Sequence, residues 1–352
     1  MKSNASRVMR PASIKDVARL ANVSPATVSR ALNAPVRLEA DTLARVQSAI
    51  AALGYVPDGV ARSLRTQRTQ TVGMCIPNLQ FSMFSETVET VQVELNRAGF
   101  TLLLAVTGYD ADLELAELSA MVQRGIDGIV LVGGQHHPQL FAMLRTRRIP
   151  YVIVWSFHAD HPSVGFDHRR AMVGVTTHLL ECGHERIAAV MSSVQQNDRV
   201  RDRLAGIRDA LSARGLTLPD SYQISISTGL RAGREAMAHL LDLPRPPTAV
   251  ACGNDVIAIG ALMECRARGL DVPRDMSITG FCEMEIGQMQ SPMLTTVRTP
   301  IATMGRKAAH YLVDRMQRDV PEIHEEIPTE LLIRESSGLA PRGNLGAGPT
   351  AR

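Results

Sequence analysis

The sequence predicts a multi-domain protein in which an all-α head, residues 1–57, precedes an α/β core of two lobes, residues 71–340. Helical periodicity runs through the head, whereas short apolar runs alternate with amphipathic stretches of helix length from residue 71 onward. Charge divides in the same place. Residues 1–68 hold eleven Lys and Arg against four Asp and Glu, a net charge of +7, and the remainder carries −4. A basic head on a mildly acidic body indicates a polyanion-binding module joined to something else.

Composition bounds the class of protein. The chain has 352 residues, of which 45% are hydrophobic and 21% charged, as is typical of globular proteins. Its five cysteines are widely spaced and form no CxxC pair, which argues against a disulfide framework or a structural zinc site. No run approaches the ~20 apolar residues of a membrane span, and the N-terminus lacks the apolar core of a signal peptide. We therefore expect a cytoplasmic protein.

Segment 13–33 predicts two short helices separated by a tight turn. In the first helix, apolar residues recur at the i, i+3, i+4, i+7 spacing of one helical face: Ile14, Val17, Ala18 and Ala21. Ser13 is expected to cap this helix, and Ser24 to cap the second helix, which begins with Pro25. A third helix over 39–53, ending at Gly54, would complete a small core.

The outward face of the second helix carries small residues, hydroxyls and one arginine: Pro25, Ala26, Thr27, Ser29 and Arg30. Such a face suits the major groove of DNA, where hydroxyls reach phosphates and an arginine can bond guanine O6 and N7. A small helical bundle with a solvated arginine would show the same pattern. The helix-turn-helix motif therefore indicates DNA binding only when the neighbouring segments support it.

Residues 58–70 form a basic linker. A short helix over 59–64 would have nothing to pack against, and arginines stand at 62, 65 and 68. One interpretation is a disordered linker. The other is a hinge helix that orders on DNA, with Leu64 wedged into the minor groove and the arginines on phosphates.

The core alternates continuous apolar strands with amphipathic helices, which predicts parallel sheets covered on both faces. The expected strands are 71–77, 101–106, 128–134, 150–155, 163–167, 186–191, 222–227, 248–253, 276–281 and 325–333. The expected helices are 83–97, 112–124, 138–147, 169–181, 199–214, 230–241, 255–268 and 301–318. These are too many for one sheet, so we expect an N-lobe of about 71–165 and 298–323 and a C-lobe of about 166–297 and 324–340. Residues 341–352 read as a disordered tail.

The head resembles the lac repressor (LacI/GalR) family of transcription regulators over IKDVARLANVSPATVSRALN (14–33) and LGYVPDGVARSL (53–64). The core resembles the sugar-binding core of the same family, which is similar to type I periplasmic binding proteins. The matching stretches are RLAG (203–206), GNDVIAIGAL (253–262), GLDVPRDMSITGF (269–281) and SPMLTTV (291–297). Within the family, SVGFDHRRAM (163–172) and GFCEMEIGQMQSP (280–292) look most like gluconate-operon repressors.

The resemblance implies a sequence-specific repressor that binds a palindromic DNA operator as a homodimer, with a tetramer left open, and that needs no cofactor or metal. The DNA contacts it implies are Pro25, Ala26, Thr27, Ser29, Arg30, Asn33, Ala61, Leu64 and Arg65. Arg30 is the expected base reader, with a phosphate contact as the alternative. Leu64 matches the wedge leucine of the family's hinge helix, and Ala61 and Arg65 flank it.

Two-lobed α/β proteins bind ligands outside the carboxyl ends of strands. The candidate effector contacts are therefore Phe84, Trp155, Phe166, Asp167, Arg203, Asn254, Asp255, Cys282 and Glu283. Arg203 matches the family's ligand-holding arginine, with a surface ion pair as the alternative. Trp155 could be plain core, and Asp255 could cap the next helix. Many relatives carry Asp where this chain has Cys282, which fits an acidic effector such as a sugar acid.

Two other classes of protein would share parts of this pattern. A periplasmic solute-binding protein would need a signal peptide and would leave the +7 head unexplained. A sugar-processing enzyme is disfavoured because the sequence has no P-loop, no G-x-G-x-x-G after the first strand and no G-x-S-x-G. His136, His137 and His158 read as solvated loop residues, not metal ligands. We therefore expect a regulator, not an enzyme.

Overall fold

The computed structural model describes residue 10 and residues 12–33, 38–56, 68–79, 82–192 and 197–341. The chain divides into two compact units, residues 1–69 and 70–352, which we treat separately. No helix in the described ranges combines the length and the apolar character needed to cross a membrane. The expected linker helix and the tail beyond residue 341 lie outside the described residues.

The first unit contains α1 (Ile14–Leu20), α2 (Pro25–Asn33) and α3 (Ala40–Leu53) around a small core that includes the fully buried Val17, Val28 and Val46. The predicted caps are confirmed. The Asp16 carboxylate accepts hydrogen bonds from the backbone N–H and the hydroxyl of Ser13, at 3.0 and 2.6 Å. The Ser24 hydroxyl accepts the Thr27 N–H at 3.1 Å, and Gly54 ends α3 with a positive φ of 55°.

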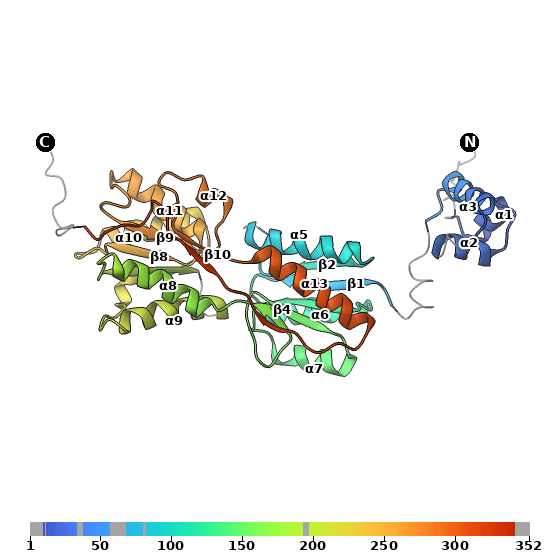
Figure 1. Cartoon of the computed structure of the whole chain (residues 1–352), viewed down its shortest axis with the longest axis horizontal. Helices are drawn as coiled ribbons and strands as arrows, with labels where there is room; N and C mark the ends of the chain where they lie inside the picture. The colour runs from blue at the N-terminus through green and yellow to red at the C-terminus, as the bar shows by residue number, and fades with distance from the viewer. Residues whose placement is uncertain are drawn as a thin grey trace, which may run out of the picture. The chain divides into compact units, whose positions relative to one another are not determined.

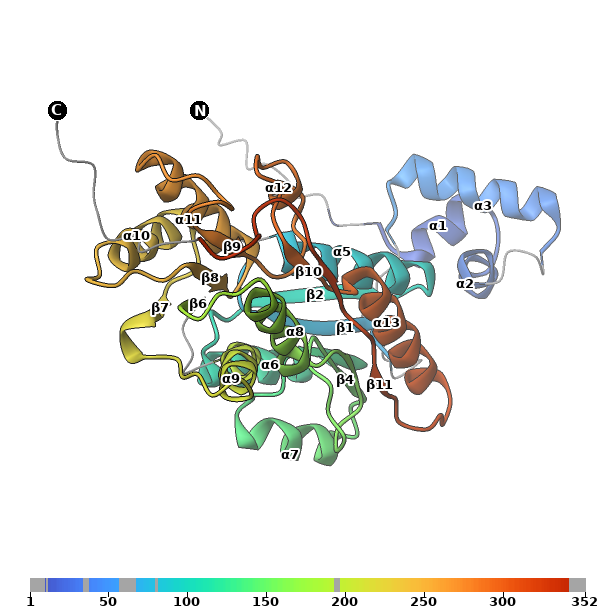
Figure 2. The ribbon, with the colours of Figure 1, turned by 60° about the vertical axis from the view of Figure 1, so that its left-hand side comes forward.

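The N-lobe of the second unit is a parallel six-stranded sheet in the order β11-β5-β4-β3-β1-β2. Helices α5 and α13 lie side by side on one face (Figures 1 and 2), and α6 and α7 cover the other. The strands are β1 (Thr71–Ile76), β2 (Thr101–Val106), β3 (Gly128–Val132), β4 (Tyr151–Val154), β5 (Ser163–Gly165) and β11 (His324–Glu326). The helices are α5 (Ser82–Arg97), α6 (Ala111–Gln123), α7 (Pro138–Arg147) and α13 (Ile301–Gln317).

The C-lobe is a parallel four-stranded sheet in the order β7-β6-β8-β9. Helices α8 and α9 cover one face, and α10 and α11 the other (Figure 1). The strands are β6 (Ile187–Ser192), β7 (Gln223–Ile226), β8 (Ala249–Cys252) and β9 (Ser277–Thr279). The helices are α8 (His168–Glu181), α9 (Asp198–Ser212), η2 (Asp220–Tyr222), α10 (Leu230–Leu241), α11 (Asp255–Ala267) and α12 (Glu285–Gln288).

The single strand expected over residues 325–333 is divided in the structure. Residues 325–333 form two short strands instead of one, because the segment pairs with different partners in turn. First, β11 joins the parallel N-lobe sheet beside β5; then β12 (Glu330–Leu332) pairs antiparallel with β10 (Thr296–Arg298). The N-lobe sheet therefore includes β11, up to Glu326.

Candidate functional site

A polar cavity lies between the lobes, where the carboxyl ends of the two parallel sheets face one another. Its N-lobe wall comprises Asn78, Met83, Phe84, Tyr109 and Trp155; the rest is lined by His168, Ser192, Asn197, Arg199, Arg203, Thr228 and Asn254. The cavity volume is about 20 Å³, room for about one water molecule. Three effector contacts that were predicted from their positions at strand ends line this cavity together with Arg203. They are Phe84, Trp155 and Asn254.

Trp155 anchors an aromatic wall of this cavity. The indole Nε1 donates a hydrogen bond to the Thr87 hydroxyl at 3.1 Å, and its ring packs 5.5 Å from Phe84 and 5.9 Å from Phe166. The residue is 2% exposed and has a positive φ of 73°, which is unusual for a side chain of this size. Trp155 therefore belongs both to the core and to the cavity wall.

Two buried arginines project from one face of α9. Arg203 is 7% exposed, stacks 4.7 Å above the Phe281 ring and forms no salt bridge among the described residues. Arg199, one turn earlier, is 4% exposed, and the carboxylate it contacts is that of the adjacent Asp198, at 3.4 Å. Burial lowers the pKa of Arg203 from its usual value. The positive charge of these two guanidinium groups is therefore only slightly offset by nearby carboxylates.

Three buried polar atoms in the cavity wall have no hydrogen-bond partner in the described structure: Arg203 Nε, Asn78 Oδ1 and His168 Nδ1. The His168 Nε2 donates to the Trp155 carbonyl at 2.7 Å, and burial, followed by the nearby Arg203, holds its pKa well below the usual value. The ring is therefore neutral, and Nδ1 is an acceptor. Because an unpaired buried polar group costs about 1–3 kcal/mol, one donor and two acceptors without partners on residues that line one cavity indicate a ligand.

Cys282 stands behind Met83 on the C-lobe side. It is 4% exposed, its Sγ lies 3.9 Å from the Met83 Sδ, and burial raises its pKa to about 12. The thiol is therefore neutral at physiological pH and offers Arg203 no counter-charge.

Asp255 and Glu283 do not line this cavity. Asp255 accepts hydrogen bonds from the Thr296 hydroxyl and the Met284 N–H, both at 2.6 Å, and burial raises its pKa to about 7. Glu283 pairs with Arg298 at 2.6 Å and with Arg334 at 2.5 Å. Both carboxylates thus hold the loop after β9 in place. The cap of α11 is Asn254, whose Oδ1 accepts the Ile257 N–H at 3.0 Å.

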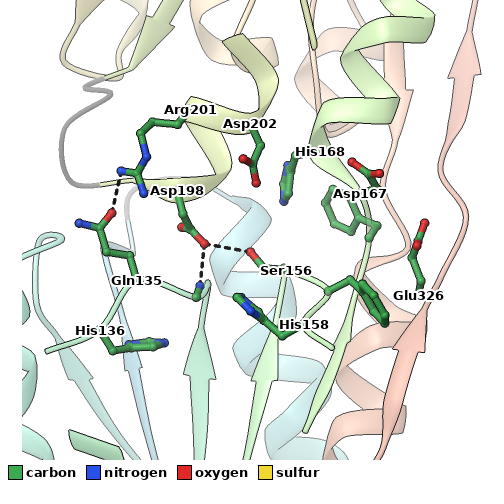
Figure 3. Close-up of a pocket in the computed structure, with 13 residues that line it drawn as sticks. Gln135, His136, Ser156, His158, Asp167, His168, Asp198, Arg201, Asp202 and Glu326 are labelled. Carbon is green, nitrogen blue, oxygen red and sulfur yellow. Dashed lines mark hydrogen bonds between the residues drawn. The ribbon is translucent and has the colours of Figure 1, made fainter. Parts of the chain in front are cut away.

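A wider pocket of about 600 Å³ lies between the lobes beside α9 and shares His168 with the smaller cavity (Figure 3). The Asp198 carboxylate bridges the lobes there, accepting from the Gly134 N–H at 2.7 Å and the Ser156 hydroxyl at 3.3 Å; nearby, Arg201 donates to Gln135 at 2.8 Å. The pocket is lined by Gly134, Gln135, His136, Ser156, Phe157, His158, Phe166, Asp167, His168, Asp198, Arg201, Asp202 and Glu326. The predicted Phe166 and Asp167 lie here, where Asp167 also caps α8.

The prediction that His136 is solvated is wrong. Its side chain is 1% exposed, with Nδ1 bonded to the Glu114 carboxylate at 2.7 Å and Nε2 to the Gly133 carbonyl at 2.8 Å. His137 instead caps α7, accepting the Gln139 N–H. The described ranges contain no group of three or more His, Cys, Asp or Glu that could hold a metal.

In the head, the predicted reading face of α2 turns outward. Pro25, Ala26 and Arg30 are exposed, Thr27 and Ser29 are half-buried, and the opposite face buries Val28. Arg30 forms no salt bridge in the described part of the chain. The side chain of Asn33, and all of Ala61, Leu64 and Arg65, lie outside the described residues.

Asn78, His168 and Arg199 line the cavity but were not predicted from the sequence. Arg199 could have been found, because it stands four residues before Arg203 on a predicted helix and so shares its face. Asn78 and His168 carry no such signal, since only the folded chain shows that their polar atoms lack partners.

An exposed helix-turn-helix face, joined by the chain to a two-lobed core with a polar cleft, is the arrangement of a DNA-binding protein with a ligand-binding core. Comparison with known proteins agrees. Residues 13–58 match the model of the bacterial regulatory proteins of the lacI family, and residues 176–337 match the periplasmic binding protein-like domain. The chain belongs to the lacI family. It is a DNA-binding transcription repressor with a ligand-binding core.

Three relatives support this membership. The chain is 33% identical to the transcriptional repressor CytR of Escherichia coli K12, over 94% of this chain and 97% of CytR. It is 27% identical to a lacI-family regulator from Silicibacter pomeroyi, with a TM-score of 0.85 over 93% of this chain and 99% of that one. A complex of the regulator CelR with cellobiose is 28% identical, with a TM-score of 0.68, covering 93% and 100%.

Proposed function

We propose that this repressor acts in the cytoplasm as a homodimer on a palindromic operator, and that a sugar acid of the gluconate kind, bound between the lobes, controls its affinity for DNA. The ligand's carboxylate would lie against Arg203 and Arg199. The observation that carries the proposal is the pair of buried guanidinium groups with a single weak carboxylate contact between them. A planar guanidinium binds a carboxylate through two parallel hydrogen bonds, and buried charges require such a partner.

The remaining polar atoms suit hydroxyl groups. Asn78 Oδ1 and His168 Nδ1 are both acceptors, so each can take a hydrogen bond from a sugar hydroxyl. The aromatic wall of Phe84 and Trp155 offers an apolar face for the carbon chain. The CelR–cellobiose complex supports a carbohydrate ligand for this kind of core.

Binding would change how the lobes meet. A cavity of about 20 Å³ is far smaller than a six-carbon acid, so the ligand requires the walls to move apart. The contacts that must adjust are among those that join the lobes, which include Cys282 with Met83 and Asp198 with Gly134 and Ser156. A ligand can shift the equilibrium between the two lobe arrangements only if it binds one of them more tightly than the other. The resulting coupling free energy then changes the affinity of the protein for its operator.

On the DNA side, each subunit of the dimer would place α2 in the major groove of one half-site. Arg30 would read a guanine edge, Thr27 and Ser29 would contact phosphates or base edges, and Pro25 and Ala26 would make apolar contacts. Asn33, Ala61, Leu64 and Arg65 remain predictions from the family resemblance.

A thermal-shift comparison tests the effector. D-gluconate and D-sorbitol differ at one carbon, a carboxylate in one and a hydroxymethyl group in the other. We expect gluconate to stabilise the full chain, by about 2.7 kcal/mol at a hundred times its Kd, and sorbitol to have no effect. Arg203→Ala should abolish the stabilisation, whereas Arg208→Ala, on the exposed side of the same helix, should keep it. Equal shifts with gluconate and sorbitol would refute an acidic effector.

A further inference from the structure

Several arginines lie at the end of the N-lobe where its parallel strands, β1 among them, begin. In a parallel sheet with crossover helices, the helices end where the strands start. The Asp127 N–H, following α6, donates to the Thr71 carbonyl at 2.8 Å, and the Ile129 N–H donates to the Pro150 carbonyl, following α7, at 3.0 Å. The C-terminal end of α6 therefore lies beside the start of β1, and that of α7 lies beside the start of β4, two strands further along the same sheet edge. Both are at the end of the N-lobe away from the C-lobe (Figure 1).

Four arginines at this end, which we call the arginine edge, have no carboxylate partner among the described residues. They are Arg124, Arg145, Arg147 and Arg148. All four are exposed, and none forms a salt bridge within the described ranges. Other arginines at helix ends on the same side of the lobe are paired: Arg97 with Glu94 at 2.7 Å, and Arg318 with Asp314 at 2.7 Å. Among these helix ends, the unpaired charge thus belongs to α6 and α7.

Helix stabilisation does not explain the whole edge. A cation in the last turn of a helix interacts favourably with the helix dipole, which accounts for Arg145 and Arg147. Arg148, however, is the C-cap of α7 with a positive φ of 56°, a position that normally takes glycine, as Gly54 does after α3. A residue with a Cβ pays about 1–2 kcal/mol there, so local folding gives no reason for an arginine.

We infer that the arginine edge binds phosphates of the DNA that flanks the operator. The chain from the DNA-binding head joins the core at this same end, because Gln70 directly precedes β1. Duplex DNA carries one negative charge per ~1.7 Å, and exposed arginines without carboxylate partners suit such a backbone. The contacts add affinity that does not depend on sequence. The inference rests on the DNA binding that family membership gives, not on the proposed effector.

The test removes the charge without harming the fold. One variant of the full chain combines Arg124→Gln, Arg147→Gln and Arg148→Gly, the last of which also relieves the positive φ. The matched control combines Arg214→Gln, Arg231→Gln and Arg245→Gln, three exposed C-lobe arginines that also have no salt bridge in the described ranges. The probe is the palindrome that the wild-type chain selects from random duplexes. The short duplex just spans this palindrome, and the long duplex carries about two further helical turns of DNA on each side of it.

On the long duplex, we expect the edge variant to bind more weakly, with the slope of log K against log salt reduced by about 1 to 3 per subunit. On the short duplex it should match the wild type, and the control should match on both. An unchanged slope on the long duplex overturns the inference. An equal loss on short and long duplexes, or an equal loss in the control, also overturns it, because the contact would then not be to flanking DNA or not specific to this edge.

Discussion

The reading face of α2 and the cleft of the core are built in opposite ways. The face of α2 is exposed, comes from one continuous segment and rests on a core of three short helices. The cleft is buried, and its polar atoms come from distant segments between residues 78 and 254. DNA is a large, charged partner that can bind an exposed face while the contact stays open to water. A small polar ligand must be enclosed, so its site gathers unpaired polar atoms inside the fold.

This difference predicts that charge matters most where water is excluded. The clearest case is Cys282, whose neutral thiol leaves Arg203 without a counter-charge. Cys282→Asp should weaken gluconate binding by about tenfold or more, because the new carboxylate would neutralise the guanidinium and repel the ligand. Calorimetric titration of the full chain with gluconate measures this.

The isosteric Cys282→Asn variant is the control for that substitution. Asp and Asn both tolerate the positive φ of 98° at this position, and they differ in charge alone. Asn should keep most of the affinity. If Asp and Asn variants bound gluconate equally, the missing charge at Cys282 would have no part in recognition.

On the exposed side, Arg30→Ala should cost about 1–3 kcal/mol of operator binding, the usual value of one bidentate base contact. It should also relax base preference at one position of each half-site. Binding to a panel of single-base operator variants checks both expectations. An unchanged ranking of that panel, with affinity lowered uniformly, would make Arg30 a phosphate contact instead.

A further prediction concerns the pH dependence of stability, at Asp255. Burial raises its pKa to about 7 from an ordinary 3.8, so the folded chain holds this proton more tightly than the unfolded chain does. Its contribution to the free energy of unfolding is therefore full below pH 3.8 and is lost as pH rises towards 7. Asp255→Asn should flatten this part of the pH dependence in denaturant unfolding. Parallel curves for wild type and variant would show that Asp255 does not titrate in this range.

Local signals in the sequence predicted most of the fold. Ser13, Ser24 and Gly54 cap helices as expected, because capping depends on residues within one turn. The split of residues 325–333 into β11 and β12 could not be predicted, since it depends on which sheet each half meets. His136 was misassigned for the same reason: its partners, Glu114 and Gly133, lie on other elements or at a turn.

The candidate site was predictable only in part. Arg203, Trp155, Phe84 and Asn254 follow from strand ends and family resemblance, and the structure brings them to one cavity. Asp255 and Glu283 stand at equivalent strand ends in the sequence, yet their side chains turn to Thr296 and to Arg298 and Arg334. Strand-end position therefore predicts proximity to a cleft, but side-chain partners decide which residues face it.

The central claim is that a carboxylate ligand held by α9 of the core controls the DNA affinity of the head. The most direct measurement is the operator Kd of the full chain with and without saturating D-gluconate, for wild type and Arg203→Ala. We expect gluconate to change the wild-type Kd; the variant should have the same Kd as the wild type without ligand, and gluconate should not change it. A wild-type Kd that does not move with gluconate, or a variant that responds as fully as the wild type, would contradict it.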